Sequence, residues 1–179
     1  VTFGGRADTE PFIRRGREVA QITGVSYARE RITDNLAAGL KPPENAAYSI
    51  ALLHANIGHQ AGHADYAPAT VEELATAGFN YWALGHVHTQ STLASDPAMI
   101  VYPRNTQGRN PRESGPRGCL QVDVDTYGRA HLEFIDTSVA RWVHLEISIA
   151  GIGAMDQLVD LMLAKGREAL ATLLGGGSR

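Results

Sequence analysis

The chain has 179 residues, of which 44% are hydrophobic and 20% charged, a balance typical of one soluble domain with its own core. Its formal net charge of -3 argues against a surface that is basic throughout, but it does not exclude a local basic patch. No apolar run approaches the roughly 20 residues that a membrane-spanning helix needs, and the single cysteine, Cys119, excludes an internal disulfide, which suits a reducing cytoplasm.

The first forty residues predict few regular elements. Residues 1–3 are expected to be the remainder of a strand, and a polar loop follows over 4–11. The apolar residues of 18–27 predict a strand, and a short helix is expected over 28–40. The prolines of 41–45 end that helix, because proline lacks the amide proton and constrains the residue before it.

Residues 48–54 and 81–84 predict two apolar strands. Between them, 70–78 predicts a short helix, because its apolar residues recur near helical spacing, Thr70 can cap its N-terminus and Gly78 can stop it. A strand, helix, strand crossover makes the two strands parallel, so that their carboxyl ends lie at one edge of the sheet. In open α/β sheets that edge is where ligands bind.

A histidine follows each of these two strands. His54 ends the first strand, and Gly85-His86-Val87-His88 follows the second, with a glycine that lets the backbone pass close to a neighbour. Residues two apart in an extended chain point the same way, so His86 and His88 are expected to share a side. Most such pairs are surface or satisfied core groups, but a third histidine at the same edge favours metal binding.

The loop after His54 contains two further histidines, His59 and His63. The loop also contains two glycines and a proline, so the four-residue spacing of these histidines does not place them on one face of a helix. A second metal site is one interpretation, and a substrate-facing or solvated loop is the simpler one.

Beyond His88 the pattern predicts antiparallel strands. Short strands are expected over 90–93 and 99–102, and two alternating strands over 120–124 and 131–134. Alternation then continues over 142–149, which predicts one more strand.

His131 and His144 fall on the outward positions of these strands, so neither is expected to bind a metal. The last element, 155–174, predicts an amphipathic helix whose apolar stripe needs a partner surface. The chain then ends in Gly-Gly-Gly-Ser-Arg, and because it also begins without methionine, we expect a fragment.

The loop between Tyr102 and Gly118 has the most unusual composition in the chain. It contains arginines at positions 104, 109, 112 and 117. A solvated loop is the simple interpretation, yet arginine binds phosphate through two parallel hydrogen bonds, and Asn105 and Gln107 can orient it or donate to the same oxygens.

Three of these features together resemble a known family: the strand ending at His54, the Gly85-His86-Val87-His88 box, and the Tyr102-Pro103...Asn105...Gln107-Gly108-Arg109 loop. They resemble the calcineurin-like metallophosphoesterases, and among these the bacterial SbcD-like DNA repair exonucleases. The resemblance covers about residues 16–142 and implies part of an α/β/β/α sandwich, in which parallel strands with a crossover helix precede an antiparallel meander and a final helix. Residues 1–141 would be the C-terminal half of the nuclease domain, and 142–179 a strand and helix leading into a truncated capping region.

The resemblance also implies a set of site residues. His54 and His86 would ligate the second of two divalent ions, usually manganese, and His88 the first. The implied substrate-binding residues are Asn105, Gln107 and Arg109. The family usually has glycine where Arg104 stands, so a positive φ at Arg104 would strain the turn.

The earlier motifs of the family, Asp-x-His, Gly-Asp-x-x-Asp and Gly-Asn-His-Asp, have no counterpart in this sequence. They supply the bridging carboxylate, the remaining ligands and the histidine that acts on the leaving group, and Asp8, Asp34 and Asp65 lack that context. Because two dications need carboxylate oxygens to offset their charge, the isolated chain is expected to be inactive, with no catalytic residue of its own.

The parent protein is therefore expected to be a cytoplasmic two-metal DNA exonuclease or phosphodiesterase of DNA repair. Family resemblance implies DNA as substrate, a homodimer, and an SMC-like ATPase partner whose usual contact segments lie beyond Arg179. The lack of a long apolar run implies no membrane. A phosphatase or phosphodiesterase acting on nucleotides or phosphoproteins is one alternative, and a non-catalytic interaction module is another. Imidazole must be neutral to bind a metal, so metal affinity should fall as the pH drops through about 6.5.

Overall fold

The computed structural model describes residues 3–27, 32–58 and 66–175. The chain divides into two compact units, one formed by Val1–Gly108 with Pro116–Arg141 and the other by Arg109–Gly115 with Trp142–Arg179. The first unit contains the strands and the predicted histidine site, and the second contains the long helix. Each unit is considered by itself.

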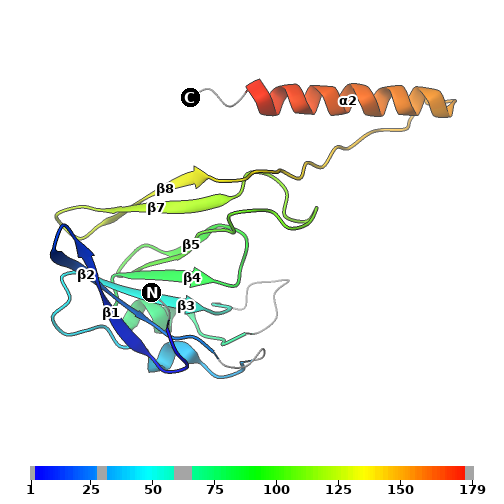
Figure 1. Cartoon of the computed structure of the whole chain (residues 1–179). Helices are drawn as coiled ribbons and strands as arrows, with labels where there is room; N and C mark the ends of the chain where they lie inside the picture. The colour runs from blue at the N-terminus through cyan, green and yellow to red at the C-terminus, as the bar shows by residue number, and fades with distance from the viewer. Residues whose placement is uncertain (1–2, 28–31, 59–65, 176–179) are drawn as a thin grey trace. The chain divides into compact units, whose positions relative to one another are not determined.

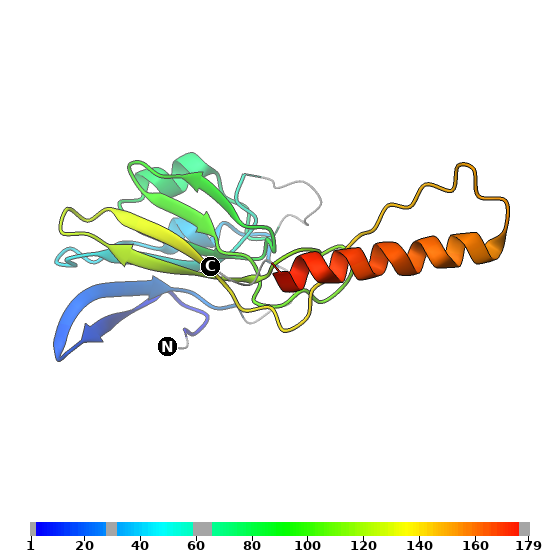
Figure 2. The same ribbon diagram turned by 90° about the horizontal axis from the view of Figure 1, so that it is seen from above.

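The first unit is built on a six-stranded mixed sheet with the strand order β1-β2-β3-β4-β6-β5. Its strands are β1 (Asp8–Arg14), β2 (Arg17–Gly24), β3 (Ser49–His54), β4 (Tyr81–Gly85), β5 (Ser91–Ala94) and β6 (Met99–Tyr102). The four central strands, β2, β3, β4 and β6, run parallel, and β1 and β5 close the two edges in the antiparallel sense. Figure 2 shows the β1–β2 hairpin along one edge.

The crossover from β3 to β4 contains the helix α1 (Val71–Thr76), as predicted. Thr70 caps it: its hydroxyl accepts a hydrogen bond from the Glu73 amide at 3.1 Å, and the Glu73 carboxylate accepts one from the Thr70 amide at 2.7 Å. Gly78 ends the turn with a φ of 89°. The indole of Trp82 donates to the Leu74 carbonyl at 3.0 Å and so fixes α1 against β4.

Each face of the six-stranded sheet packs against a different layer (Figure 1). On one face, α1, the short 3-10 helix η1 (Leu36–Gly39) and the loops form a core around Leu53, Leu74 and Trp82. On the other, Tyr48, Tyr81 and Val101 pack with apolar residues of a separate hairpin, β7 (Gly118–Val124) and β8 (Ala130–Asp136). The unit is thus an α/β fold with parallel strands, a crossover helix and an antiparallel hairpin, as predicted.

The N-terminal region departs from the sequence prediction. The prediction of a loop over 4–11 is wrong for 8–11, because β1 begins at Asp8. All seven residues of β1 are exposed. In the described part of the predicted helix 28–40, the only helix is the single turn η1, while 28–31 lie outside the described residues, as do Val1 and Thr2.

Two later segments also differ. β5 and β6 pair antiparallel as expected, but β6 also pairs parallel with β4, which the alternating pattern did not predict. The strand predicted over 142–149 is wrong: this segment is fully described and contains no strand. β7 and β8 do alternate as predicted, and His131 and His144 are exposed.

The second unit is dominated by α2 (Met155–Gly175), one continuous helix (Figure 1). It was predicted over 155–174, and much of its apolar stripe is exposed, including Val159, Met162 and Leu163. Among the described residues, no helix is both long and apolar enough to cross a membrane.

Candidate metal site at the sheet edge

The candidate site lies at the carboxyl edge of β3 and β4. His54 ends β3 and stands opposite Gly85, the last residue of β4. The ladder continues one step beyond His54, where the Ala55 amide donates to the Gly85 carbonyl at 3.3 Å. A Cβ atom on Gly85 would lie 2.8 Å from Nδ1 of His54. Glycine at position 85 therefore gives the His54 imidazole the space that it occupies.

His86 follows directly and brings its ring to His54. The two ring centroids lie 5.2 Å apart with an interplanar angle of 76°. An imidazole bound through one nitrogen at about 2.1 Å has its centroid about 3.2 Å from the ion, so two such rings at a tetrahedral angle have centroids about 5 Å apart. The spacing of the pair thus suits two ligands of one metal ion.

The backbone of His86 has a φ of 96°, a value that residues other than glycine rarely adopt. Such backbone strain costs about 1–3 kcal/mol and is concentrated at functional sites. The expectation that His86 and His88 share a side assumed an extended chain. That assumption is wrong, because β4 ends at Gly85 and the chain is not extended at His86.

Charge and burial favour the neutral form of the imidazole at this edge. Burial lowers the pKa of His54 from its usual 6.5, and the nearby positive charges that His86 and His88 would carry lower it further. His88 is therefore within electrostatic reach of His54. A neutral ring presents the lone pair that a metal needs.

Two tyrosines complete a cluster of four rings, and no sequence pattern had pointed to them. Tyr66 stacks on His86, with centroids 5.4 Å apart and an interplanar angle of 20°, and meets the edge of His54 at 5.6 Å. The ring centroid of Tyr27 lies 5.8 Å from that of His54 and 5.2 Å from that of Tyr66. Burial, and then the neighbouring Tyr27 hydroxyl, raise the pKa of Tyr66 to about 12, so the Tyr66 side chain stays neutral.

Tyr102 holds the loop that follows His54 through two hydrogen bonds. Its hydroxyl, fully buried on β6, donates to the Ala55 carbonyl at 2.8 Å and accepts from the Ile57 amide at 2.8 Å. This pair of bonds fixes the direction in which the chain leaves β3. His59 and His63 lie outside the described residues, so their role stays a prediction.

Asn105 lies in the loop after β6, and its side chain is held at both ends. Its Oδ1 accepts a hydrogen bond from Arg117 at 3.0 Å, and its Nδ2 donates to the Gln107 carbonyl at 2.8 Å. Arg104 precedes it with a φ of 88°, which confirms the strained turn expected there, and donates to the Pro116 carbonyl at 2.6 Å. Arg109 is exposed.

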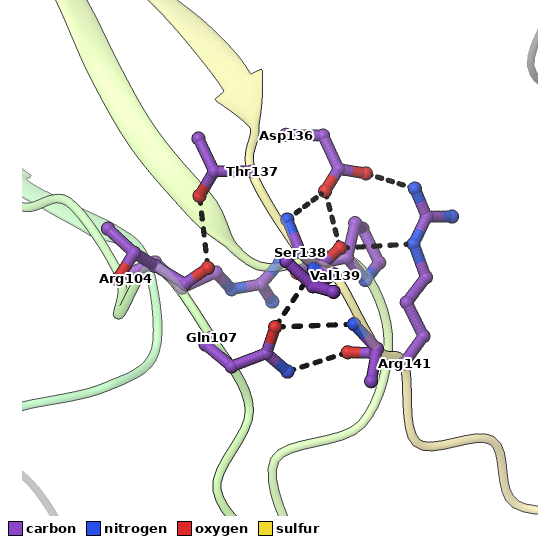
Figure 3. Close-up of polar contacts among 10 residues, drawn as sticks. Arg104, Gln107, Asp136, Thr137, Ser138, Val139 and Arg141 are labelled. Atoms are coloured by element: carbon purple, nitrogen blue, oxygen red, sulfur yellow. Dashed lines mark hydrogen bonds and ion pairs between the residues drawn. The ribbon is translucent and has the colours of Figure 1, made fainter.

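The Gln107 side chain contacts the segment that leaves β8 (Figure 3). Its Oε1 accepts from the Val139 amide at 2.9 Å and the Ala140 amide at 3.3 Å, and its Nε2 donates to the Ala140 carbonyl at 2.7 Å. The Thr137 hydroxyl adds a bond to the Thr106 carbonyl at 3.0 Å. In this structure the Gln107 amide fastens two segments together, and its contact with substrate stays a prediction.

The donor set fits a metal only in part. Three partly buried imidazoles, of His54, His86 and His88, lie at one edge, yet within the described ranges no three histidine, cysteine or acidic side chains gather closely enough to hold an ion. His54 and His86 suit one ion as a pair, and further donors must complete its coordination. The division of the three histidines between two ions stays a prediction.

The fold and the site together define an α/β protein with an imidazole cluster at the carboxyl edge of a mixed sheet. No protein-family model matches the chain. The chain is similar to a protein of Bacillus subtilis (strain 168) named "Uncharacterized metallophosphoesterase YhaO", with 31% identity over 164 residues, or 90% of this chain and 40% of the relative. This similarity supports the metallophosphoesterase superfamily. The chain spans about two fifths of the length of that relative.

Proposed function

We propose that the chain forms part of the active site of a two-metal-dependent phosphodiesterase that acts on DNA. The observation that carries the proposal is the pair of imidazoles from His54 and His86, with centroids 5.2 Å apart at the edge where ligands of α/β sheets bind. The superfamily supported by the Bacillus relative uses divalent metals. His54 and His86 would hold one ion and His88 another, with manganese as the usual metal.

The chemistry assigned to the chain's own residues is binding and orientation. Bound divalent ions supply Lewis acidity and an activated water for in-line attack on a phosphodiester. The lowered pKa of His54 keeps that ring neutral and able to bind at neutral pH. The loop of Asn105, Gln107 and Arg109 would lie on the phosphate side, where Arg109 supplies a planar cation suited to phosphate oxygens.

Metal binding tests the ligand assignment directly. Isothermal titration with Mn²⁺ on the protein in its natural length should show binding that His86→Ala weakens strongly. The matched control is His131→Ala, which removes an exposed histidine of β8 and should leave binding unchanged. Equal affinity in the His86→Ala variant and the unmodified protein would reject the assignment.

The substrate is a separate question. Rates on single-stranded DNA, double-stranded DNA and bis(4-nitrophenyl) phosphate, measured with Mn²⁺, should rank DNA first. A protein that hydrolyses the small diester or a nucleotide but not DNA would have the alternative function of a nucleotide phosphodiesterase. A protein that binds no metal and hydrolyses none of them would instead be an interaction module. The homodimer and the SMC-like ATPase partner stay part of the proposal.

A further inference from the structure

Arg117 is a buried cation in contact with two residues of the predicted site, His88 and Asn105. Among the residues that the structure describes, it is the only charged side chain that is buried, with 5% of its surface exposed. Taking a guanidinium out of water is costly unless protein acceptors replace the lost water. The groups that accept its hydrogen bonds therefore indicate what the side chain does.

Two acceptors lie on different segments of the candidate site. Nη1 of Arg117 donates to the backbone carbonyl of His88 at 2.7 Å and to Oδ1 of Asn105 at 3.0 Å. Arginine has no acceptor, so the Asn105 oxygen must face it, and the Asn105 amide group then points the other way, to the Gln107 carbonyl. A single side chain thus fixes both the His88 backbone and the orientation of Asn105.

The backbone of Arg117 is itself fixed by the hairpin. Its carbonyl accepts from the Thr137 amide at 2.9 Å, and the next residue, Gly118, begins β7 and donates to the Asn105 carbonyl at 3.1 Å. A Cβ atom on Gly118 would lie 1.9 Å from the Ile135 carbonyl oxygen, so the two strands of the hairpin are in close contact there. Arg117 therefore extends from a rigid element, as a support for a binding site should.

We propose that Arg117 is a positioning residue, which holds the segment of His88 and the loop of Asn105 in fixed relation. The inference rests on the proposed function, since His88 is a metal ligand only there. It separates Arg117 from the other arginines of its loop: the guanidinium acts through His88 and Asn105 instead of contacting phosphate. Residues that support metal ligands typically change metal affinity about 10–100-fold when they are removed.

NMR of the 179-residue chain measures the contact without any substitution. Nuclear Overhauser effects are expected between the Arg117 guanidinium protons and the Asn105 side chain. Arg117→Met keeps the aliphatic stem and removes the donors, so it should shift the His88 and Asn105 signals. Arg129→Met, an exposed arginine at the far end of the hairpin, is the matched control and should shift neither.

Calorimetric titration with Zn²⁺, a metal well suited to imidazole ligands, gives the second measurement. Arg117→Met should weaken binding about tenfold or more, and Arg117→Lys should recover part of it, because an ammonium keeps the charge but lacks the rigid fork of the guanidinium. A wild-type chain without the guanidinium contact, or a folded Arg117→Met with unchanged His88 and Asn105 signals, overturns the proposal.

The two proposals fail in different ways. If the wild-type chain binds no Zn²⁺, the NMR contact and shifts still decide whether Arg117 positions the two segments, while the Mn²⁺ titration with His86→Ala decides the metal site of the proposed function. If Arg117→Met does not fold, the wild-type contacts and Arg117→Lys decide instead. Absence of the guanidinium contact with Asn105 in the wild-type chain would then overturn the positioning role.

Discussion

The space beside Gly85 gives a sharp test of how the site is built. In a Gly85→Ala variant, the new Cβ would lie 2.8 Å from Nδ1 and 3.5 Å from Cγ of His54. Ordinary van der Waals contact begins near 3.4 Å, so the ring must move by about 0.6 Å. That ring is packed against His86, Tyr66 and Tyr27, with centroids 5.2, 5.6 and 5.8 Å away. The displacement therefore changes the whole cluster.

Overpacking of this kind costs roughly 1–3 kcal/mol of unfolding free energy. For a chain of this size, each kcal/mol lowers the unfolding midpoint by about 2–4 °C. The expected result for Gly85→Ala is a midpoint roughly 2–12 °C lower, changed NMR signals for His54 and weaker binding of Zn²⁺. The ligand pair loses affinity because its spacing of 5.2 Å no longer holds.

Thermal unfolding followed by circular dichroism, with two-dimensional NMR of the imidazoles, provides the assay. Gly39→Ala is the matched control, because a Cβ there meets no atom within 4 Å. Gly39→Ala should leave the His54 signals unchanged. If Gly85→Ala and Gly39→Ala have the same midpoint and the same His54 signals, the close approach of His54 to Gly85 is refuted.

Two further predictions concern Arg104 and Asp136. Arg104→Ala loses the bond to the Pro116 carbonyl but keeps the strained φ of 88°, whereas Arg104→Gly loses the bond and relieves the strain, so the glycine variant should be about 1 kcal/mol more stable in chemical denaturation. Equal stability would contradict this strain argument. Hydrogen bonds from Ser138, and then the charge of Arg141, lower the pKa of Asp136 from 3.8, so its contribution is present above pH 3.8 and is lost as the pH falls through the lowered value. Asp136→Asn should therefore lose less stability on acidification than the unmodified chain, and equal acid dependence of the two would refute the linkage.

The sequence was most informative where burial imposes a pattern. β3, α1 and β4 were predicted because their buried faces require apolar residues at fixed spacing, and the capping residues around α1 mark its ends. The strand β1 was missed for the opposite reason. All its residues are exposed, so backbone pairing with β2 determines its structure and no hydrophobic pattern is needed.

The segment 142–149 shows the converse error. Its residues alternate as a strand would, yet all but one are exposed and the structure forms no strand there. Alternation predicts a strand only where a partner strand supplies the hydrogen bonds. The pairing of β6 with β4 was missed for a related reason, since alternation does not say which strand is adjacent.

The approach of the two histidines was predictable from the sequence, and the side chains that pack around them were not. Two strands that end in histidine predict the approach of His54 and His86, because parallel strands bring their carboxyl ends together. Tyr66 and Arg117 are different: Tyr66 stacks on His86 from a loop, and Arg117 reaches the His88 carbonyl from the position just before β7. Their roles depend on tertiary packing, and the sequence placed Arg117 among three other arginines without a distinguishing signal.

The bonds of Gln107 affect how experiments at this position can be interpreted. Its amide holds the backbone of Val139 and Ala140, just before the second unit begins at Trp142. Any substitution at Gln107 therefore releases the exit segment at the same time as it alters the loop of Asn105. A loss of activity in such a variant reports on substrate binding only if hydrogen exchange shows residues 137–141 still protected. The Thr137 hydroxyl, which donates to the Thr106 carbonyl, is then the contact that still joins the exit segment to this loop.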